Sequence, residues 1–456
     1  MEILIVTHYY KHKNAMASIR PIKLAKYFSQ QGHRVTVLTS LQKDNWCKQE
    51  LNPIPSKNIR EIYAPEYKGM YFLRKLYAFM ERRRHIKKEK SENNFSTLNT
   101  KSEVNSFCES QIILFKKYLS WFYYYSCDRF ENWCLYKGLK NIVISENLRG
   151  FDYVIATYPG AGIHKTGEWI KKSHRAKQFV ADYRDPAYNP GGRTMKAEIR
   201  HDKKVQDDAV YMADLIVCVS NGMAEALSKQ YDKEAIAPIY VVRNGFDPAD
   251  NEIVVDTGID EQFFNFVYTG ALYNGRRTVA MLAKVLKELV DEAIIDVSKI
   301  KIHYAGSDYQ VLLSQLKPYN LQSIAVDHGY VTRQQSLSMQ IAADVVLLLN
   351  WNQDNYTGVI PGKIYEYMSS GSIIIALIMG NQRDSETAEM IRKDHLGCAC
   401  EQAVSTDLED LKSYIKCMYI NYVNGCRPSL DTEVVSKYKY EKIAQEYIRL
   451  LNKHLI

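Results

Sequence analysis

Long apolar runs are missing from this sequence. No stretch reaches the roughly 18 apolar residues that a membrane-spanning helix needs, and the nearest candidate, residues 112–125 (IILFKKYLSWFYYY), contains two lysines. The first residues, MEILIVTHYY, have neither the basic region nor the cleavage site of a signal peptide. We therefore expect a cytoplasmic protein.

Metal-binding and redox motifs are also scarce. The nine cysteines form no CxxC pair, and none has the spacing to histidine that zinc sites use. No DxD-type acidic motif stands out. These absences predict reduced cysteines and a protein that requires neither a metal ion nor a cofactor.

Glycine is absent from the loop after the first expected strand. The chain has no glycine between Thr7 and Gly32, whereas NAD and FAD domains carry GxGxxG there so that the backbone can approach a pyrophosphate. A nicotinamide oxidoreductase is therefore disfavoured. Cationic side chains are present instead, Arg20 among them, near the sheet edge where open α/β folds bind ligands.

A strong overall charge is lacking as well. The net charge of +8 is too weak to indicate nucleic-acid binding, but residues 70–90 hold eight Lys or Arg and two Glu. This basic segment, together with the aromatic segment 112–125, is suited to an anionic membrane surface. The alternatives are a solvated helix face and a helix packed under a loop.

The apolar pattern predicts an α/β protein. Short continuous apolar runs are typical of buried parallel strands, and helical spacing lies between them at residues 21–31 and 279–290. The expected strands are 3–7, 34–39, 153–157, 178–182, 215–220, 239–243, 264–269, 301–304, 323–327, 345–349 and 372–376.

Two α/β units follow one another along the chain. The polar stretch 244–262 separates them and begins with the turn dipeptide Asn244-Gly245. We therefore predict two Rossmann-like, doubly wound domains facing each other across a cleft. The predicted divisions are one domain at 1–245, a second domain at 246–435, and a helix at 436–456 that packs back on the first domain.

The clearest candidate site is the segment 356–371, YTGVIPGKIYEYMSSG. A Pro-Gly loop leads into a helix, whose N-terminus favours phosphate. Lys363 adds a cation, and Glu366 lies on the same helix face, where it can accept both hydroxyls of a ribose. Arg276 and Arg277 follow another strand of the same domain, and two cationic loops in one cleft fit a diphosphate.

Polar residues also follow two neighbouring strands of the first half. His164 comes after strand 153–157, and Asp182, Arg184 and Asp185 come at the end of strand 178–182. A single histidine is usually structural, but four polar residues on adjacent strand ends favour a substrate-binding wall.

The order and spacing of several motifs resemble the retaining family-4 glycosyltransferases, which have the GT-B fold. The resemblance extends from the first strand to about residue 400. Its motifs are ILIVTHYY, FVADYRDPAY, ADLIVCVSNGMAEAL, VVRNGFD, FVYTGALYNGRR, GYVT, AADVVLLL and TGVIPGKIYEYMSSG.

This resemblance implies roles for individual residues. Glu366 matches the second glutamate of the family's E-x7-E motif, which binds the donor ribose. Arg277 falls near the basic diphosphate-binding position, and His164 matches a histidine near the transferred sugar. The turn Tyr330, Val331, Thr332 would line the nucleobase, and the backbone of Gly358, Val359 and Ile360 would touch the sugar and phosphate.

The chain departs from the family at two positions. Gly358 stands where the first glutamate of E-x7-E is expected, and Ala271 stands at the first basic position after Gly270. Lys363 is expected to replace part of the lost charge. These departures leave the identity of the donor open.

The resemblance predicts transfer of a hexosyl or N-acetylhexosaminyl group from a nucleotide diphosphate-sugar, with retention. A UDP-sugar is the favoured donor, His164, Arg277 and Lys363 are the expected catalytic residues, and no metal is required. A polyprenyl-linked glycan of a bacterial surface polysaccharide, such as a capsule or lipopolysaccharide, is the expected acceptor, at the inner face of the cell membrane. We expect the domain at 1–245 to bind this acceptor and the domain at 246–435 to bind the sugar nucleotide. The residues assigned to the acceptor side are Arg20, Asp182, Arg184 and Asp185. Two alternatives remain: a sugar-nucleotide epimerase and a non-catalytic sugar-nucleotide-binding scaffold.

Overall fold

The computed structural model describes most of the chain. It covers residues 1–11, 16–41, 56–65, 106–186, 188, 195–251, 254–352, 358 and 360–455, without the side chains of Met16 and of residues 106–124. The basic segment 70–90 and nearly all side chains of 112–125, where we predicted membrane contact, lie outside the described residues.

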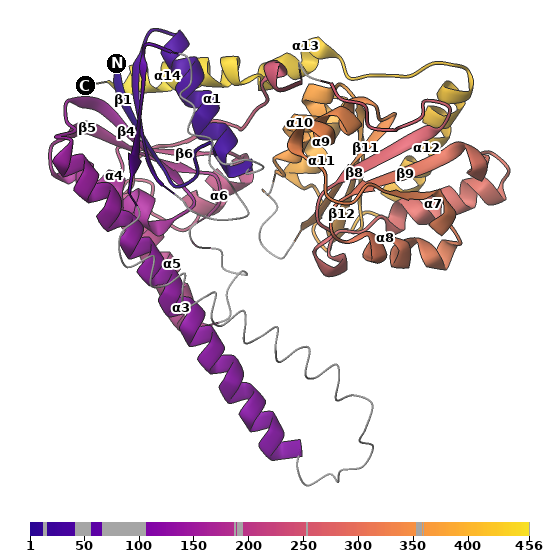
Figure 1. The fold of residues 1–456 in the computed structure, drawn as a ribbon, viewed down its shortest axis with the longest axis horizontal. Coiled ribbons are helices and arrows are strands. Elements are labelled where there is room, and N and C mark those ends of the chain that lie inside the picture. The colour runs from indigo at the N-terminus through magenta and orange to yellow at the C-terminus, as the bar shows by residue number, and fades with distance from the viewer. Residues whose placement is uncertain are drawn as a thin grey trace. The chain divides into compact units, whose positions relative to one another are not determined.

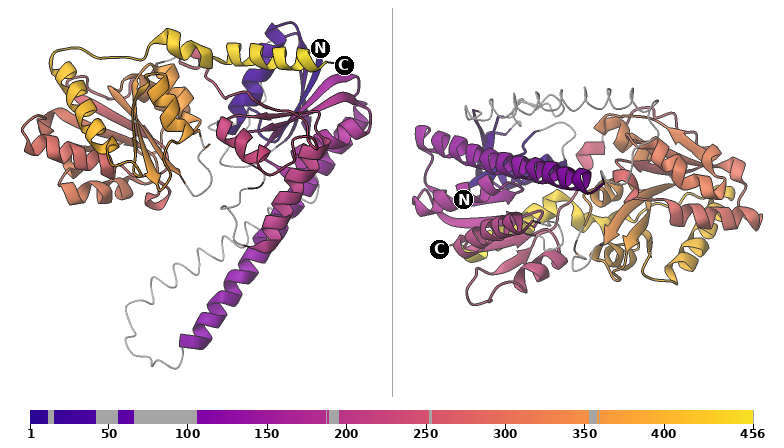
Figure 2. Two further views of the ribbon diagram at one scale, coloured as in Figure 1. Left: turned by 180° about the vertical axis from the view of Figure 1, so that it is seen from behind. Right: turned by 90° about the horizontal axis from the view of Figure 1, so that it is seen from below.

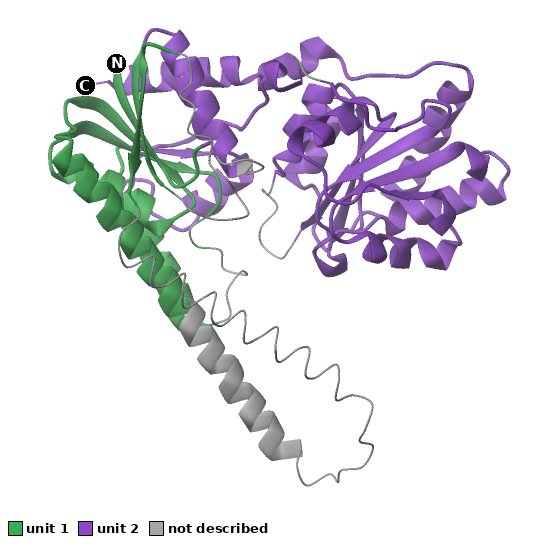
Figure 3. Cartoon of the chain, viewed as in Figure 1, with its two compact units in different colours: residues 1–10, 33–214 green, residues 11–32, 215–456 purple. Residues whose placement is uncertain are grey.

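The chain divides into two compact units. One comprises residues 1–10 and 33–214, and the other residues 11–32 and 215–456 (Figure 3). This division does not test the domain boundaries predicted after residues 245 and 435, which stay predictions.

The first sheet has seven strands in the order β3-β2-β1-β4-β5-β6-β7 (Figure 1). Its strands are β1 (Glu2–Thr7), β2 (Arg34–Ser40), β3 (Ile59–Ala64), β4 (Phe151–Tyr158), β5 (Ala176–Tyr183), β6 (Leu215–Cys218) and β7 (Ile239–Val241). Strand β1 pairs in parallel with β2 and with β4. The sequence pattern located six of these strands.

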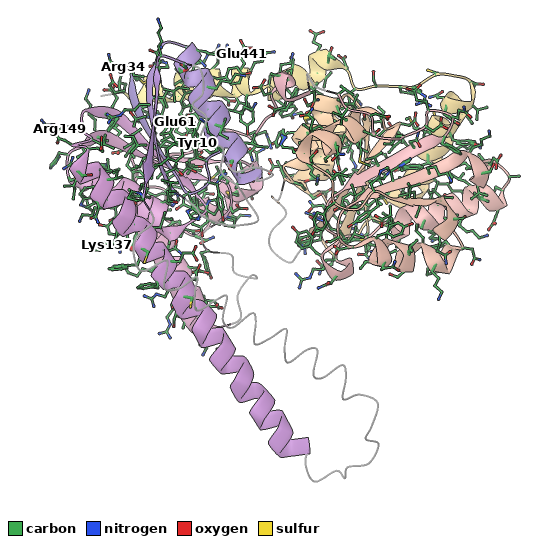
Figure 4. The ribbon with its side chains drawn as sticks, in the orientation of Figure 1. Tyr10, Arg34, Glu61, Lys137, Arg149 and Glu441 are labelled. Atoms are coloured by element: carbon green, nitrogen blue, oxygen red, sulfur yellow. The ribbon has the colours of Figure 1, made fainter. Side chains whose placement is uncertain are left out.

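The strand that the pattern missed is β3. It lies in a polar part of the chain and is partly exposed, so it lacks the continuous apolar run that marks a buried strand. A hydrogen bond of 3.2 Å from the Tyr10 hydroxyl to the Glu61 carboxylate links it to the chain just after β1 (Figure 4).

The helices that accompany this sheet are α1 (Met16–Gln30), α3 (Ser106–Ser145), α4 (Ala161–Lys172), α5 (Lys196–Met212) and α6 (Asn221–Ser228). The helix predicted from residue 21 begins earlier, at Met16, and passes through Pro21. Proline has a helical φ angle, so a helix can pass through it at the loss of one hydrogen bond.

The second sheet has six strands in the order β10-β9-β8-β11-β12-β13. Its strands are β8 (Phe264–Thr269), β9 (Ile300–Ala305), β10 (Ala325–Asp327), β11 (Val345–Asn352), β12 (Ile373–Gly380) and β13 (Gly397–Glu401). All six residues of β8 are buried, as a central strand covered on both faces requires.

Helices cover both faces of this sheet. Figure 1 shows α9 (Arg333–Ile341), α10 (Lys363–Ser370) and α11 (Glu386–Lys393) on one face and α7 (Ala280–Asp291), α8 (Tyr309–Leu316) and α12 (Asp407–Val423) on the other. Parallel strands with helices on both faces form a doubly wound sheet.

The last helices are α13 (Thr432–Val435) and α14 (Tyr440–His454). Helix α14 lies alongside α1, as both views in Figure 2 show. The ring of Tyr447 packs 5.6 Å from the ring of Phe28, centroid to centroid. The apolar face that predicted a C-terminal helix is therefore the face that packs on α1.

Candidate functional site

The predicted cation Lys363 is the first residue of α10. It is preceded by Gly362, and no side chain caps the helix there. The Lys363 ammonium donates a hydrogen bond of 3.1 Å to the hydroxyl of Thr269, the last residue of β8. This contact joins the phosphate-binding loop predicted near residue 360 to the carboxyl end of the central strand.

The environment of Lys363 is unusual for an ammonium group. Burial lowers the pKa of Lys363, Arg277 and Arg333 lower it further, and Glu366 opposes them. Keeping the Lys363 ammonium charged in this desolvated position, beside two other cations, costs free energy unless an anion compensates it. Perturbed groups of this kind are concentrated at functional sites.

Two further side chains fix the position of Thr269. The Ser336 hydroxyl donates to the Thr269 hydroxyl at 2.9 Å, and the Gln340 amide donates to it at 3.3 Å. Thr269 itself belongs to β8, and both donors belong to α9. Two elements of the same unit therefore fix the hydroxyl oxygen that accepts the hydrogen bond from Lys363.

The predicted ribose ligand Glu366 lies one turn into α10. Its side chain is 10% exposed, and its carboxylate lies 3.3 Å from the Arg333 guanidinium. Arg333 also lies 3.5 Å from Asp250, which bonds to Lys23 of α1 at 2.5 Å. Sequence reasoning missed Arg333, although it directly follows the predicted nucleobase turn.

Arg277 lies among aromatic rings. Its guanidinium carbon is 4.7 Å from the ring centroid of Tyr273 and 5.2 Å from that of Trp351. One of its nitrogens donates to the Tyr268 hydroxyl at 3.4 Å. The pKa of Lys363 responds to the charge of Arg277, so the structure brings these two predicted cations together. Arg276 is exposed and makes no such contact among the described residues.

The predicted nucleobase turn comes next to this group. Tyr330 is 86% exposed, and Val331 packs against a small cluster that includes Val267. Thr332 caps α9: its hydroxyl accepts from the backbone N–H of Gln335, whose side chain accepts in return from the N–H of Thr332. This capping box leaves Tyr330 as an open aromatic surface.

Gly358 occupies the position of the missing glutamate. It packs directly on the backbone of Gly222, where a Cβ atom on Gly358 would lie 2.6 Å from the Gly222 Cα. Ile360 is partly buried against the core, and Val359 lies outside the described residues.

An unpredicted carboxylate sits beside this contact. Glu386 accepts hydrogen bonds from the backbone N–H groups of Asn221 (2.9 Å) and Gly222 (2.8 Å), and Arg243 lies 2.6 Å from it. Glu386 thus occupies the N-terminus of α6, where the helix dipole favours an anion. Glu386 lies 28 residues after Gly358, and no motif in the sequence signals it.

The predicted catalytic histidine lies in the interior of the other unit. His164 is 1% exposed, and its ring centroid lies 4.7 Å from that of Tyr183. Burial lowers its pKa to about 4, with smaller opposing contributions from Asp182 and Ala156. His164 and Asp182 are therefore close together, and the imidazole is neutral at physiological pH.

The three polar residues predicted at the end of strand 178–182 lie at the end of β5 or just after it, and neighbouring groups hold them. Asp182 is fully buried and accepts a hydrogen bond of 2.7 Å from the Thr157 hydroxyl. Arg184 donates to the Tyr158 carbonyl at 2.7 Å. Burial raises the pKa of Asp185, and Arg184 opposes this shift.

Arg20 has different neighbours. It is 1% exposed and donates to the carbonyl of Arg243 at 2.9 Å. Its guanidinium carbon also lies 5.8 Å from the ring centroid of Tyr447. These contacts lie within its own unit. The assignment of Arg20 to the acceptor side stays a prediction.

Metal-binding clusters and membrane spans were also sought. The described residues contain no group of three or more His, Cys, Asp or Glu side chains placed to hold a metal ion. In the same part of the chain, no helix is long and apolar enough to cross a bilayer. That the protein requires neither a metal ion nor a cofactor stays a prediction.

Known proteins resemble this chain in structure and not in sequence. No protein-family model matches it, and no curated protein matches it either. Sucrose-phosphate synthase from Thermosynechococcus elongatus matches 99% of this chain with 98% of its own, at a TM-score of 0.58 and 12% identity.

Two further structures match at similar levels. A trehalose-6-phosphate protein from E. coli bound with UDP-2-fluoro glucose covers 99% of this chain with 99% of its own, at a TM-score of 0.57 and 9% identity. The lipopolysaccharide outer core galactosyltransferase WaaB, in its apo form, covers 100% of both chains at 0.51 and 13% identity. At these identities the likeness shows the fold alone, which is GT-B, as the sequence predicted.

Proposed function

We propose that this protein is a glycosyltransferase that moves a sugar from a nucleotide diphosphate-sugar to a glycan or lipid-linked acceptor. The observation that carries the proposal is the gathering of Arg277, Arg333 and Glu366 around Lys363, whose ammonium bonds to Thr269 at the carboxyl end of β8. Ligands of open α/β sheets bind at this end of the strands.

Each group in this set suits one part of the donor. Cleavage of the bond between sugar and diphosphate develops negative charge on the diphosphate, which the Lys363 and Arg277 cations would stabilise. Because Lys363 is partly buried and its ammonium is desolvated, its charge is screened less than in water. The Glu366 carboxylate would accept hydrogen bonds from the two ribose hydroxyls.

A uridine nucleotide is the donor that we favour. Its support is the fold shared with the E. coli protein bound with UDP-2-fluoro glucose. We also propose that the sugar, a hexosyl or N-acetylhexosaminyl group, is transferred with retention, as the family-4 resemblance implies. A departing diphosphate held by protein cations needs no metal ion in this scheme.

We propose surface-polysaccharide synthesis at the inner face of the membrane as the biological setting. The fold shared with a lipopolysaccharide galactosyltransferase supports it, as does an exposed aromatic surface on α3. There the rings of Phe130 and Trp133 stack at 5.7 Å, each 41% exposed, and the Lys137 ammonium lies 5.6 Å from the Trp133 centroid (Figure 4). Interfacial aromatic residues beside cations suit an anionic bilayer.

Flotation with anionic vesicles at physiological salt tests this setting. We expect the full chain to float with the vesicles, and a Phe130→Ser, Trp133→Ser double variant to float less. Equal flotation of the double variant would exclude this surface of α3 from the contact, and no flotation at all would count against a membrane setting.

A non-catalytic sugar-nucleotide-binding scaffold is the second candidate. The observation that favours it is Gly358, which replaces a sugar-binding glutamate and contacts Gly222, leaving no space for a side chain. A scaffold would bind the nucleotide sugar and leave it intact. No residue of the described site specifically favours an epimerase.

A thermal-shift screen with nucleotides and nucleotide sugars tests the donor site. A ligand that binds only the native state raises the melting temperature, and we expect a nucleoside diphosphate to do so in the parent and not in Glu366→Ala. Glu409→Ala, an exposed acidic residue on α12, is the matched control. No shift with any nucleotide would contradict the proposal, and a shift without turnover of any nucleotide sugar would favour the scaffold.

A further inference from the structure

One nitrogen atom of Arg333 is shared by two carboxylates. Its Nη2 atom lies 3.3 Å from a Glu366 oxygen and 3.5 Å from an Asp250 oxygen. Charge-assisted hydrogen bonds of a guanidinium prefer about 2.7–2.9 Å, and a guanidinium can give two parallel bonds to a single carboxylate. Arg333 therefore lies between two partners and is fully engaged by neither.

The position of Arg333 requires anionic partners. It is the first residue of α9, and the positive end of the helix dipole disfavours a cation there. In the part of the chain that the structure describes, Glu366 and Asp250 are the only carboxylates in ion-pair contact with it. Because both offset the same charge, the loss of one should strengthen the contact with the other.

Asp250 is held in place from the side of α1. Its other oxygen, Oδ1, accepts a hydrogen bond of 2.5 Å from the Lys23 ammonium, which also donates to Asp247 at 2.8 Å. The Lys26 ammonium donates to the same Asp247 oxygen at 2.7 Å. Asp247 is 2% exposed and Lys23 is 12% exposed, so water and salt screen these ion pairs less than they screen surface pairs.

The short helix that carries Asp250 is also tied to the helix that carries Glu366. It comprises Pro248–Asn251, and the Asn251 amide donates to the Ser369 carbonyl at 2.8 Å and to the Ser369 hydroxyl at 2.9 Å. Ser369 belongs to α10, as Glu366 does. The two carboxylates therefore keep their separation, and the long side chain between them is the one that can shift.

Glu366 needs a cation nearby but not a full ion pair. Its side chain is 10% exposed, so its charge is costly without compensation. A guanidinium bonded to both carboxylate oxygens, however, would occupy the acceptor positions that ribose hydroxyls require. A cation drawn partly away offsets the charge and leaves these positions open.

We propose that Asp250 is a positioning residue that sets the preference of the donor site for ribose. It draws Arg333 partly away from Glu366 and so keeps the Glu366 carboxylate open to the ribose hydroxyls. The inference rests on the proposed glycosyltransferase function, in which Glu366 binds the donor ribose. Asp250 does not touch the donor, and its influence passes through Arg333.

Isothermal titration of the full-length chain with a nucleoside diphosphate and its 2′-deoxy form tests the proposal. The probe is the diphosphate that gives the largest thermal shift, which we expect to be UDP. The parent should bind the ribose form about tenfold more tightly, as one hydrogen bond to a charged group contributes. In Asp250→Asn this preference should fall to about threefold or less, because Arg333 then closes on Glu366 and competes with the hydroxyls.

A double-mutant cycle separates this role from a structural one. Asp250→Asn should lower the ribose preference of the parent and have no further effect in Arg333→Gln, because its influence needs the guanidinium. The loss of a purely structural contact would weaken binding of both nucleotides by the same factor in either background.

The matched control is Asp291→Asn. It removes an exposed carboxylate that pairs with Lys287 on α7, and it should keep the ribose preference of the parent. Melting temperatures without ligand show whether each variant is folded. If Asp250→Asn is not, Asp250→Ser removes the same charge with a smaller side chain.

Three results would overturn the proposal: equal binding of both nucleotides by the parent, an unchanged preference in Asp250→Asn, or an equal effect of Asp250→Asn with and without Arg333. In each case the diphosphate still binds, and the proposed function stands. Failure of the parent to bind any nucleotide would instead reject the proposed function, and this role of Asp250 with it.

Discussion

Gly222 and Gly358 meet backbone to backbone. A Cβ on Gly358 would lie 2.6 Å from the Gly222 Cα, and a Cβ on Gly222 would lie 2.4 Å from the Gly358 Cα. Real side chains do not approach backbone so closely, so a side chain at position 358 would clash with α6. Glycine at position 358 is therefore part of a packing contact.

This contact predicts the effect of adding a side chain. Gly358→Ala should destabilise the protein by about 1–3 kcal/mol, as overpacking does, and Gly358→Glu should be no more active than the parent. Urea unfolding measures the first effect, and donor turnover measures the second. Gly138→Ala is the control, because a Cβ there would lie 3.5 Å from its nearest neighbour, the Pro65 carbonyl oxygen, in ordinary contact. Faster sugar transfer by Gly358→Glu than by the parent would show that the loop moves away from α6.

Lys363 predicts opposite effects on stability and on binding. Because burial lowers its pKa, protonation of Lys363 costs stability at pH values below the lowered pKa, and this cost disappears as the pH rises towards its ordinary value near 10.5. Lys363→Met should leave the free protein unchanged or up to about 2 kcal/mol more stable at neutral pH. It should also abolish most of the thermal shift given by a nucleoside diphosphate.

The control for this variant is Lys393→Met, an exposed lysine on α11, which should change neither property. Lower stability of Lys363→Met with unchanged diphosphate binding would assign Lys363 a purely structural role.

Replacing Arg333 is expected to weaken donor binding. It lies between Glu366 (3.3 Å) and Asp250 (3.5 Å), so Arg333→Gln removes the cation that faces the ribose ligand. We expect donor affinity to fall about tenfold, and less for a 2′-deoxyribose donor, which already lacks one hydroxyl. Isothermal titration with both donors measures this. Arg383→Gln, an exposed arginine that bonds to the Ala403 carbonyl at 3.1 Å, should bind like the parent, and equal losses with both donors would argue against a role at the ribose.

Much of the fold was predictable because buried parallel strands leave a local signal. The run FNFVYT marks β8 with its observed bounds, and IYVVR marks β7. Strand β3 escaped because its side chains are partly exposed. Helix α1 was placed too late because proline was taken as its start.

The site was predictable residue by residue and not as an arrangement. Lys363 and Glu366 share a helix, which spacing reveals, but the bond from Lys363 to Thr269 joins residues 94 apart in the chain. Arg333 and Glu386 carry no motif, since their roles come from the backbone and carboxylates that tertiary packing places beside them. The burial of His164 in α4 could not be predicted from a single histidine that follows a strand.

His164 predicts a dependence of stability on pH. Its pKa falls from an ordinary 6.5 to about 4 on folding, so the unfolded chain binds a proton that the folded chain does not. The contribution of His164 to the free energy of unfolding is therefore fully present above pH 6.5. It is lost as the pH falls towards 4, by up to about 3 kcal/mol. His164→Phe should remove that part of the loss, as measured by urea unfolding at pH 7 and pH 4.5, whereas His174→Asn, an exposed histidine in the turn after α4, should lose stability like the parent. An equal loss in His164→Phe and the parent would mean that the buried His164 imidazole does not cause this part of the pH dependence.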